Sequence, residues 1–268
     1  MPTFTRFASS HSTKAKLHEI RIKHQRHCRR DWLFYNLKMK STPLKRSVIN
    51  RSIEEAKAAF QQFGIHLPPF AFRQAQEWEQ PSADADEIRD CMLGWDATDF
   101  GSGRFEQIGR TLFTLRNGTS RKPGYPKVYA EKLLFDPEGQ RAPAHFHHAK
   151  MEDICCRAGG NILVQLTGVN AEDAPSDQPI FAKVDGVRVQ VEPRGIIRLR
   201  PGMSVCIPPR TIHQFWAEEG CGIAVSSEVS SVCDDWSDNF FLEPAERFPK
   251  IEEDAARTHY LCHEYPTL

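Results

Sequence analysis

Two histidines separated by one residue, followed five residues later by a glutamate, are the feature that most restricts how this chain can fold. On a β-strand, side chains two residues apart point to the same face, so His145 and His147 can be directed at one point. Glu152 can return to that point from the next turn or strand. Two neutral imidazoles and a carboxylate suit a divalent metal ion. Gly139 and Gly159 flank the group where the chain must turn sharply, which predicts a ligand strand between tight turns.

The fourth ligand is expected to be His213, on a facing strand. The segment that contains His213 resembles the first ligand segment, because a glycine, Gly202, begins it. Pro208-Pro209 then bends the chain before the histidine. The other histidines are weaker candidates. His148 would point away from the metal on a regular strand, and the rest lie in the basic N-terminal region, at a helix end or near the C-terminus. Three imidazoles and one carboxylate leave up to two positions of an octahedral ion for a substrate with two adjacent oxygens.

From Trp95 onward, short apolar runs alternate with turn residues. The dipeptide Asp185-Gly186 between two such runs is a strong hairpin signal. Many short strands with this spacing indicate an antiparallel sandwich or barrel. The predicted strands cover residues 105–108, 111–115, 128–135, 144–147, 162–167, 180–184, 187–191, 196–199, 204–207, 213–216 and 222–229.

Helices are expected before the strands. An amphipathic helix over 47–63 would be capped by Ser47 and ended by Gly64. Shorter helices are predicted over 71–79 and 83–91. The fold class is therefore mainly β, a barrel with N-terminal helices. The apolar stripe of the first helix consists of Ile49, Ile53, Ala56, Phe60 and Phe63.

The charge of the 268-residue chain is unevenly distributed. Residues 1–50 contain twelve Lys or Arg and two acids, whereas the remainder contains 23 basic and 33 acidic residues. The body is therefore mildly acidic and not a nucleic-acid surface. Residues 1–43 are interpreted as a basic, disordered extension. The alternatives are a mistaken upstream start codon, with Met39 as the natural start, and an organelle-targeting segment. Residues 44–268 are expected to form one domain.

No apolar run approaches the ~18–20 residues that a membrane-spanning helix requires. No apolar signal segment follows Met1. The eight cysteines include no Cys-x-x-Cys pair and no disulfide-framework spacing. Reduced thiols in a cytoplasmic protein are the interpretation that this pattern favours.

The ligand segments resemble the two cupin motifs. The stretch from Gly139 to Gly159 fits the first motif at every position. The second motif fits from Gly202 to Ala217, although Arg210 replaces a glycine and Ala217 replaces an asparagine. Neither replacement removes a predicted ligand.

Segments outside the ligands further resemble the D-lyxose isomerase family, over about residues 44–268. This resemblance implies a cupin-type β-barrel (jelly roll) and a homodimer that uses Mn²⁺, or Co²⁺, Fe²⁺ or Zn²⁺. It also implies interconversion of D-lyxose with D-xylulose and, usually, of D-mannose with D-fructose. The resembling segments are 45–50, 67–70, 94–103, 112–118, 145–152, 159–161, 228–232 and 247–254.

An isomerase of this type must move one proton between two carbons and another between two oxygens, through a metal-stabilised enediolate. Lys150 lies between two predicted ligands and is expected to stabilise negative charge or to donate to an oxygen; the alternative is a surface lysine. Glu228 follows an apolar strand and is the favoured general base, against a rim or hydrogen-bonding role. Glu246 is the second candidate base. A hydride shift would need no carbon base.

Other functions remain open at this level. An Fe²⁺-dependent cupin dioxygenase uses the same ligand types, and a non-catalytic sugar-binding cupin shares the fold. A phosphosugar isomerase would need a cluster of basic residues near the metal, for which only Arg210 and Arg247 are available. Arg247 is expected rather to pair with nearby acids. Three aspartates are expected to face solvent, and these are Asp234, Asp235 and Asp238.

Overall fold

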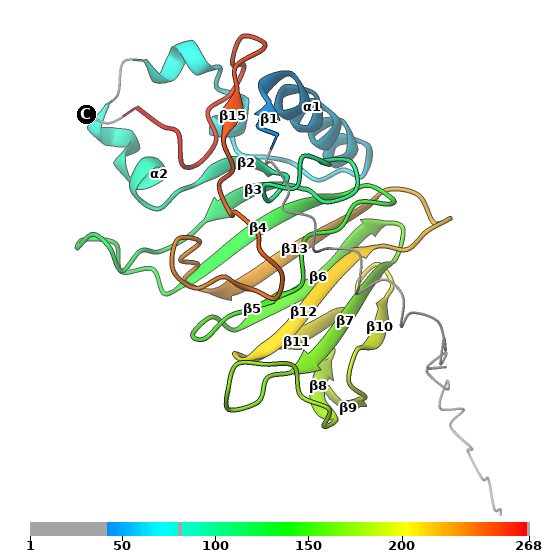
Figure 1. Cartoon of the computed structure of the whole chain (residues 1–268). Coiled ribbons are helices and arrows are strands. Elements are labelled where there is room, and N and C mark those ends of the chain that lie inside the picture. The colour runs from blue at the N-terminus through cyan, green and yellow to red at the C-terminus, as the bar shows by residue number, and fades with distance from the viewer. Residues whose placement is uncertain (1–41, 80–81, 267–268) are drawn as a thin grey trace, which may run out of the picture.

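In the computed structural model, residues 42–79 and 82–266 are described, so residues 1–41 of the predicted extension lie outside the described residues. Two antiparallel sheets enclose an apolar core (Figure 1). The eight-stranded sheet has the order β2 (Gly94–Thr98), β3 (Arg110–Arg116), β4 (Tyr129–Asp136), β13 (Ala224–Ser231), β6 (Glu152–Gly159), β11 (Ser204–Ile207), β8 (Ile180–Val184) and β9 (Val187–Val191). The five-stranded sheet has the order β10 (Gly195–Leu199), β7 (Ile162–Gly168), β12 (Thr211–Ala217), β5 (His145–Phe146) and β14 (Phe240–Phe241).

From β5 to β14 the chain passes repeatedly from one sheet to the other, which is the connectivity of a jelly roll. Inward-facing side chains of both sheets form the core, with Ile162, Val164 and Leu166 of β7 and Ile154 of β6 fully buried. The predicted cupin-type barrel is therefore confirmed, and its interior is where inward-pointing functional groups must lie.

Helix α1 (Arg46–Gln62) covers the outer face of the larger sheet and builds a second apolar cluster (Figure 1). Its buried stripe matches the predicted one, and Phe60 stacks on Trp95 of β2 with ring centroids 6.4 Å apart. Burial of each large side chain of this kind stabilises the fold by about 1.5–3 kcal/mol. The predicted cap is wrong: Ser47 lies inside the helix, where its N–H and hydroxyl donate to the Asp254 carboxylate at 2.9 and 2.7 Å. The predicted end at Gly64 is confirmed by its left-handed φ of +70°.

The two shorter helical regions are mostly 3-10 turns. Residues 69–78 form η1 (Pro69–Phe72) and η2 (Ala75–Trp78), and residues 83–90 form η3 (Ala83–Ala85) and α2 (Asp86–Asp90). A two-stranded parallel sheet, β1 (Leu44–Lys45) with β15 (Ile251–Glu252), lies beside α1. It joins the start of the described chain to its C-terminal part.

Most predicted strands are confirmed, including the hairpin of β8 and β9, whose turn residues Asp185 and Gly186 both have positive φ. The strand predicted over 105–108 is wrong, because its amides close a turn on the Arg104 carbonyl. Strands β2 and β6 were not among the predicted ranges. Among the described residues no helix is long and apolar enough to cross a membrane, and their seven cysteines are all free.

Candidate metal centre and active site

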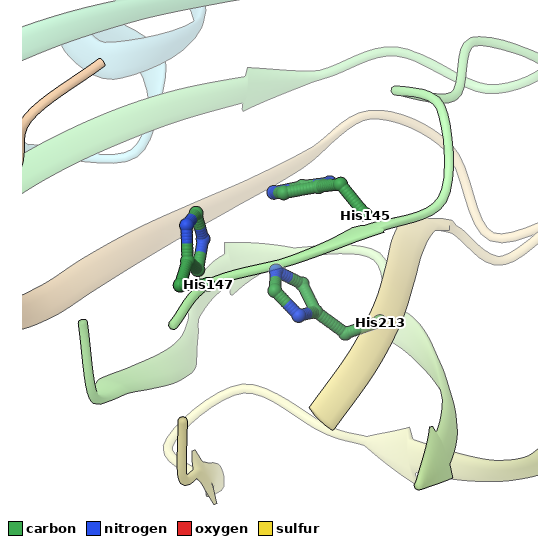
Figure 2. A group of neighbouring side chains, drawn as sticks. All are labelled: His145, His147 and His213. Carbon is green, nitrogen blue, oxygen red and sulfur yellow. The ribbon is translucent and has the colours of Figure 1, made fainter. Parts of the chain in front are cut away.

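The three predicted histidine ligands meet inside the barrel. His145 on β5 and His213 on β12 are directly paired across the two strands, and His147 follows two residues after His145. Their ligand nitrogens lie within 4.8 Å of one another, and Figure 2 shows the three rings turned toward a common centre. Glu152 reaches the same point from the first residue of β6. Its Oε1 is 2.7 Å from His213 Nε2, and its Oε2 is 3.9 Å from His147 Nε2.

Each imidazole is oriented by a backbone carbonyl. The Nδ1 position donates to that carbonyl, which assigns the hydrogen to Nδ1 and leaves the Nε2 lone pair directed into the cluster. Such an arrangement is usual for histidines that bind a metal. The pairs are His145 with Pro143 (3.0 Å), His213 with Thr211 (2.9 Å) and His147 with Asp238.

Three buried atoms of the cluster have no hydrogen-bond partner: His147 Nε2, His213 Nε2 and Glu152 Oε1. Although Glu152 Oε1 and His213 Nε2 are close, neither atom carries a hydrogen in this tautomer, so two lone pairs face each other. An unsatisfied buried polar group costs about 1–3 kcal/mol. A cation that all these atoms face would remove the cost, so the donor set fits a divalent metal ion.

The charge states also suit a cation. Burial lowers the pKa of His145 well below its ordinary value and that of His147 to about 4, so both rings are neutral near pH 7. Burial would raise the pKa of Glu152, but the adjacent Lys150 ammonium outweighs it and holds that pKa well below its usual range. His145 and His147 therefore present neutral imidazoles to the cluster, and Glu152 presents a carboxylate.

Lys150 and Glu228 adjoin the cluster. The ammonium of Lys150 is 2.7 Å from Glu152 Oε2 and 2.9 Å from Glu228 Oε1. These two carboxylates outweigh the effect of burial and raise the pKa of Lys150 well above its ordinary value. Burial would raise the pKa of Glu228, but Lys132 and Lys150 lower it. The pair is therefore a buried ammonium and a buried carboxylate beside the metal ligands.

Sequence reasoning missed that this pair continues into a buried row of alternating charges. Lys132 on β4 lies 3.6 Å from Glu228 and 3.7 Å from Asp235. Asp235 is 2.9 Å from Arg247, which also binds Asp96 of β2 at 2.5 Å. The available signal was the two charged residues, Lys132 and Asp96, beside apolar residues of their strands, where an inward charge needs partners.

Three further predictions concern the surroundings of the cluster. Arg247 pairs with acids, as expected. The prediction that the aspartates of the turn face solvent is wrong for Asp235, whose carboxylate is buried in the charged row, and for Asp238, whose carboxylate binds backbone amides. His148 points away from the cluster, as expected, and lies 3.2 Å from the Asp173 carboxylate.

Glu246, the second candidate base, lies on the loop after β14. Its N–H donates to the Phe100 carbonyl at 2.9 Å, and its side chain lies against Gly101. Among the described residues its carboxylate makes no hydrogen bond or ion pair with the histidine cluster. Arg210, at the motif position usually held by glycine, keeps a left-handed φ of +60°. Its guanidinium binds Asp173 at 2.7 Å on the surface.

Comparison with known proteins agrees with the predicted resemblance. The family model for D-lyxose isomerase matches residues 44–265. A D-lyxose/D-mannose isomerase of Escherichia coli O157:H7 is 43% identical over 223 residues, which cover 83% of this chain and 98% of that protein. One of Serratia proteamaculans is 42% identical with the same coverage.

Solved structures support the fold. The L-ribose isomerase of Cellulomonas parahominis has a TM-score of 0.52 at 17% identity, over 79% of this chain and 100% of that one. The L-ribose isomerase of Acinetobacter sp. DL28 has a TM-score of 0.53 at 15% identity, over 79% and 99%. At such identities the likeness concerns the barrel and not the chemistry. The sequence relatives carry the assignment, and this chain belongs to the D-lyxose isomerase family.

Proposed function

We propose that this member of the family interconverts D-lyxose with D-xylulose, and D-mannose with D-fructose, with a divalent metal ion held by His145, His147, Glu152 and His213. The observation that carries the proposal is the set of inward-directed, unpartnered donor atoms beside the Lys150–Glu228 pair. Relatives named for D-lyxose and D-mannose support the substrate class.

The metal would supply positive charge that stabilises the enediolate between aldose and ketose. Mn²⁺ is the proposed ion, with Co²⁺, Fe²⁺ and Zn²⁺ as substitutes, because imidazole and carboxylate ligands accept all four and supply decides among them. The chain's own contribution is to hold the donor atoms in place. It also keeps the imidazole of His147 neutral and the carboxylate of Glu152 ionised, which are the forms that bind a metal.

Glu228 is proposed as the base that moves the carbon-bound proton. It is ionised near pH 7, because two lysines offset the burial that would otherwise neutralise it. Its Oε1 also accepts from Ser230 at 3.2 Å, which limits the rotation of the carboxylate. Glu246 is retained as the alternative base on the loop after β14.

Lys150 is proposed to act on the substrate oxygens. Its ammonium lies between Glu152 and Glu228, and a positive charge there favours negative charge on an adjacent oxygen. A lysine held in its charged form by two carboxylates is suited to donate a hydrogen bond to a developing alkoxide.

A homodimer in the cytoplasm is also proposed. Free thiols at the seven described cysteines support a reducing compartment. The aromatic-rich N-terminal helices are the proposed contact between subunits, and sedimentation of the purified chain would measure the mass of the assembly.

The deciding experiment is an isomerase assay on protein stripped of metal with a chelator. D-Lyxose and D-mannose are supplied with and without Mn²⁺, and ketose formation is measured. We expect no conversion without metal and Mn²⁺-restored conversion of both sugars. His213→Ala serves as the control, because it removes one donor and leaves the other residues of the pocket in place.

Absence of conversion with every divalent ion would reject the isomerase. Oxygen consumption with Fe²⁺ would then identify the cupin dioxygenase. Sugar binding without turnover or oxygen uptake would instead identify the non-catalytic binding protein.

A further inference from the structure

One carboxylate holds three successive backbone amides in the segment that carries the metal ligands. Asp238 Oδ1 accepts from the N–H of His148 at 2.8 Å and of Ala149 at 3.2 Å. Its Oδ2 accepts from the N–H of Lys150 at 2.9 Å and of Ala149 at 3.3 Å. Successive N–H groups that converge in this way form an anion-binding concavity, which is occupied here by the protein's own side chain.

The same residue orients a ligand through its main chain. The backbone carbonyl of Asp238 accepts the hydrogen of His147 Nδ1, so that Nε2 of this ring is directed into the cluster. Asp238 therefore contacts the ligand segment at both ends. Its carbonyl binds the ring of His147, and its carboxylate binds the turn that leads from His147 to Lys150.

These contacts continue a ladder of strand pairing. Two residues after Asp238, β14 begins and pairs with β5, with Phe240 opposite Phe146 and Phe241 opposite His145. After β5 the chain leaves the strand, so the amides of residues 148–150 have no strand partner. The Asp238 carboxylate accepts their hydrogen bonds instead. Without such a partner, these three N–H groups would bond to water, which does not hold the turn in one position.

We infer that Asp238 is a positioning residue of this isomerase, which sets the direction of His147 and the place of Lys150 relative to the metal ligands. The inference rests on the proposed function, because it assigns the His147 nitrogen to a metal. Asp238 itself touches neither the donor centre nor the Glu228 carboxylate, so it acts through the two residues that it holds.

Asp238→Asn tests the inference, because an amide offers one acceptor oxygen and turns an NH₂ group toward amides that are themselves donors. We expect Co²⁺ to bind this variant about 10-fold more weakly, at the lower end of the range for groups that orient a metal-bound histidine, because the Asp238 carbonyl remains but the turn that holds it against His147 loses its side-chain contacts. The visible absorption spectrum of bound Co²⁺ should also change, because it reports the geometry of the ligands. At saturating metal, kcat should fall with KM less affected, since Lys150 is displaced.

Asp234→Asn is the matched control. Asp234 lies in the same turn, and its carboxylate binds Trp236, Ser237 and Arg121 but not the ligand segment. We expect this variant to keep the Co²⁺ affinity and spectrum of the original chain. If Asp238→Asn does not fold, Asp238→Ser takes its place, because the single oxygen of the shorter side chain cannot reach all three amides.

Wild-type Co²⁺ affinity and an unchanged spectrum in the folded Asp238 variant would overturn the inference. Equal losses in the Asp234 and Asp238 variants would do so as well, because they would indicate a general effect of the turn. Both readouts are independent of sugar turnover. A chain that binds Co²⁺ but isomerises no sugar would reject the proposed function, while the affinities of the variants would still decide the role of Asp238.

Discussion

The ligand histidines have little tolerance for change, because each ring is held by a backbone carbonyl at Nδ1 and faces the cluster with Nε2. His213 is nearly fully buried and its Nε2 faces Glu152 at 2.7 Å. We expect His213→Ala to abolish detectable Mn²⁺ binding and turnover, and His145→Ala to do the same. Isothermal titration with Mn²⁺ measures the first effect and the ketose assay the second. A His213→Ala protein that binds Mn²⁺ as tightly as the original chain would remove His213 from the ligand set.

Glu228 allows chemistry to be separated from metal binding. Glu228→Gln keeps the shape of the side chain but cannot accept a proton, so we expect a loss of kcat of about 10²–10⁴-fold, the contribution typical of a general base. Metal affinity should change little, because Glu228 is not among the four donors. Turnover near the wild-type rate would transfer the role to Glu246, and Glu246→Gln is the companion variant. If both variants keep their turnover, a hydride shift is favoured.

The buried neutral state of His147 gives a pH dependence with a defined sign. Its pKa is about 4 in the folded protein, below the ordinary value of 6.5, because of burial. The unfolded chain therefore binds more protons between these values, and stability falls as the pH falls from about 6.5 toward 4. For metal-free protein we expect this group to lower the free energy of unfolding by about 2 kcal/mol between pH 7 and pH 5. Urea unfolding with a chelator present measures it.

His147→Gln is the control for that measurement, since it cannot titrate in this range. The drop in stability between pH 7 and pH 5 should be smaller in the variant than in the original chain. An identical drop in both proteins would show that His147 does not cause it.

At the level of elements, the charged row makes β4 depend on neighbours from distant parts of the chain. The ammonium of Lys132 is buried beside Glu228, Asp235 and the Cys233 thiol. Removal of one partner from a buried ionic group typically costs about 3–5 kcal/mol, because the remaining charges stay buried. We expect Lys132→Met to destabilise the protein by that amount, measured by urea unfolding. Lys183→Met, at an exposed position of β8, should stay within about 0.5 kcal/mol of the original chain.

A small effect of Lys132→Met would mean that Glu228 and Asp235 take up protons once the lysine is absent. The pH dependence of unfolding of the variant would then show this uptake. Such uptake would support the assignment of Lys132 as the group that keeps Glu228 ionised, whereas a small effect without any proton uptake would contradict it.

Elements were predictable where local chemistry decides them. The Asp185-Gly186 turn needs two residues with positive φ, and the apolar stripe of α1 needs only its own spacing. Strand β6 was missed because its inward face begins with the Glu152 ligand, and the charged residues Asp153 and Arg157 further weaken the apolar alternation. The interior of this barrel holds functional polar groups. A strand prediction that expects every inward-facing residue to be apolar therefore fails there.

At the scale of the whole molecule, the four metal ligands were predictable because three of them lie within eight residues of one another. Their proximity depends on one strand and one turn. The charged row was not predictable, because Asp96, Lys132, Asp235 and Arg247 come from four separate segments that only the closed barrel brings together. The same holds for Asp238, which appeared to be one of several polar turn residues until pairing of β14 with β5 placed it beside the ligand segment.

Closure of the molecule around α1 depends on a second long-range group of charges. The guanidinium of Arg46, with no exposed surface, donates to Glu253 at 2.8 Å and to Glu264 at 2.6 Å, and so ties the start of the helix to the C-terminal segment. We expect Arg46→Met to lower the free energy of unfolding by about 3 kcal/mol, at the lower end of the range for broken buried pairs because Glu253 is half exposed.

Arg51→Met is the matched control, because the pair of Arg51 with Glu106 is exposed on both sides and such pairs contribute about 0–1 kcal/mol. Because α1 packs on the outer face of the sheet and the donor cluster lies inside the barrel, folded Arg46→Met should keep its Mn²⁺ affinity and its kcat at 25 °C. Urea unfolding, Mn²⁺ titration and the ketose assay on both variants measure these quantities. A folded Arg46 variant with weakened Mn²⁺ binding would show that the outer layer supports the metal centre. Equal stability of the two variants would show that the ion pairs of Arg46 do not stabilise the fold.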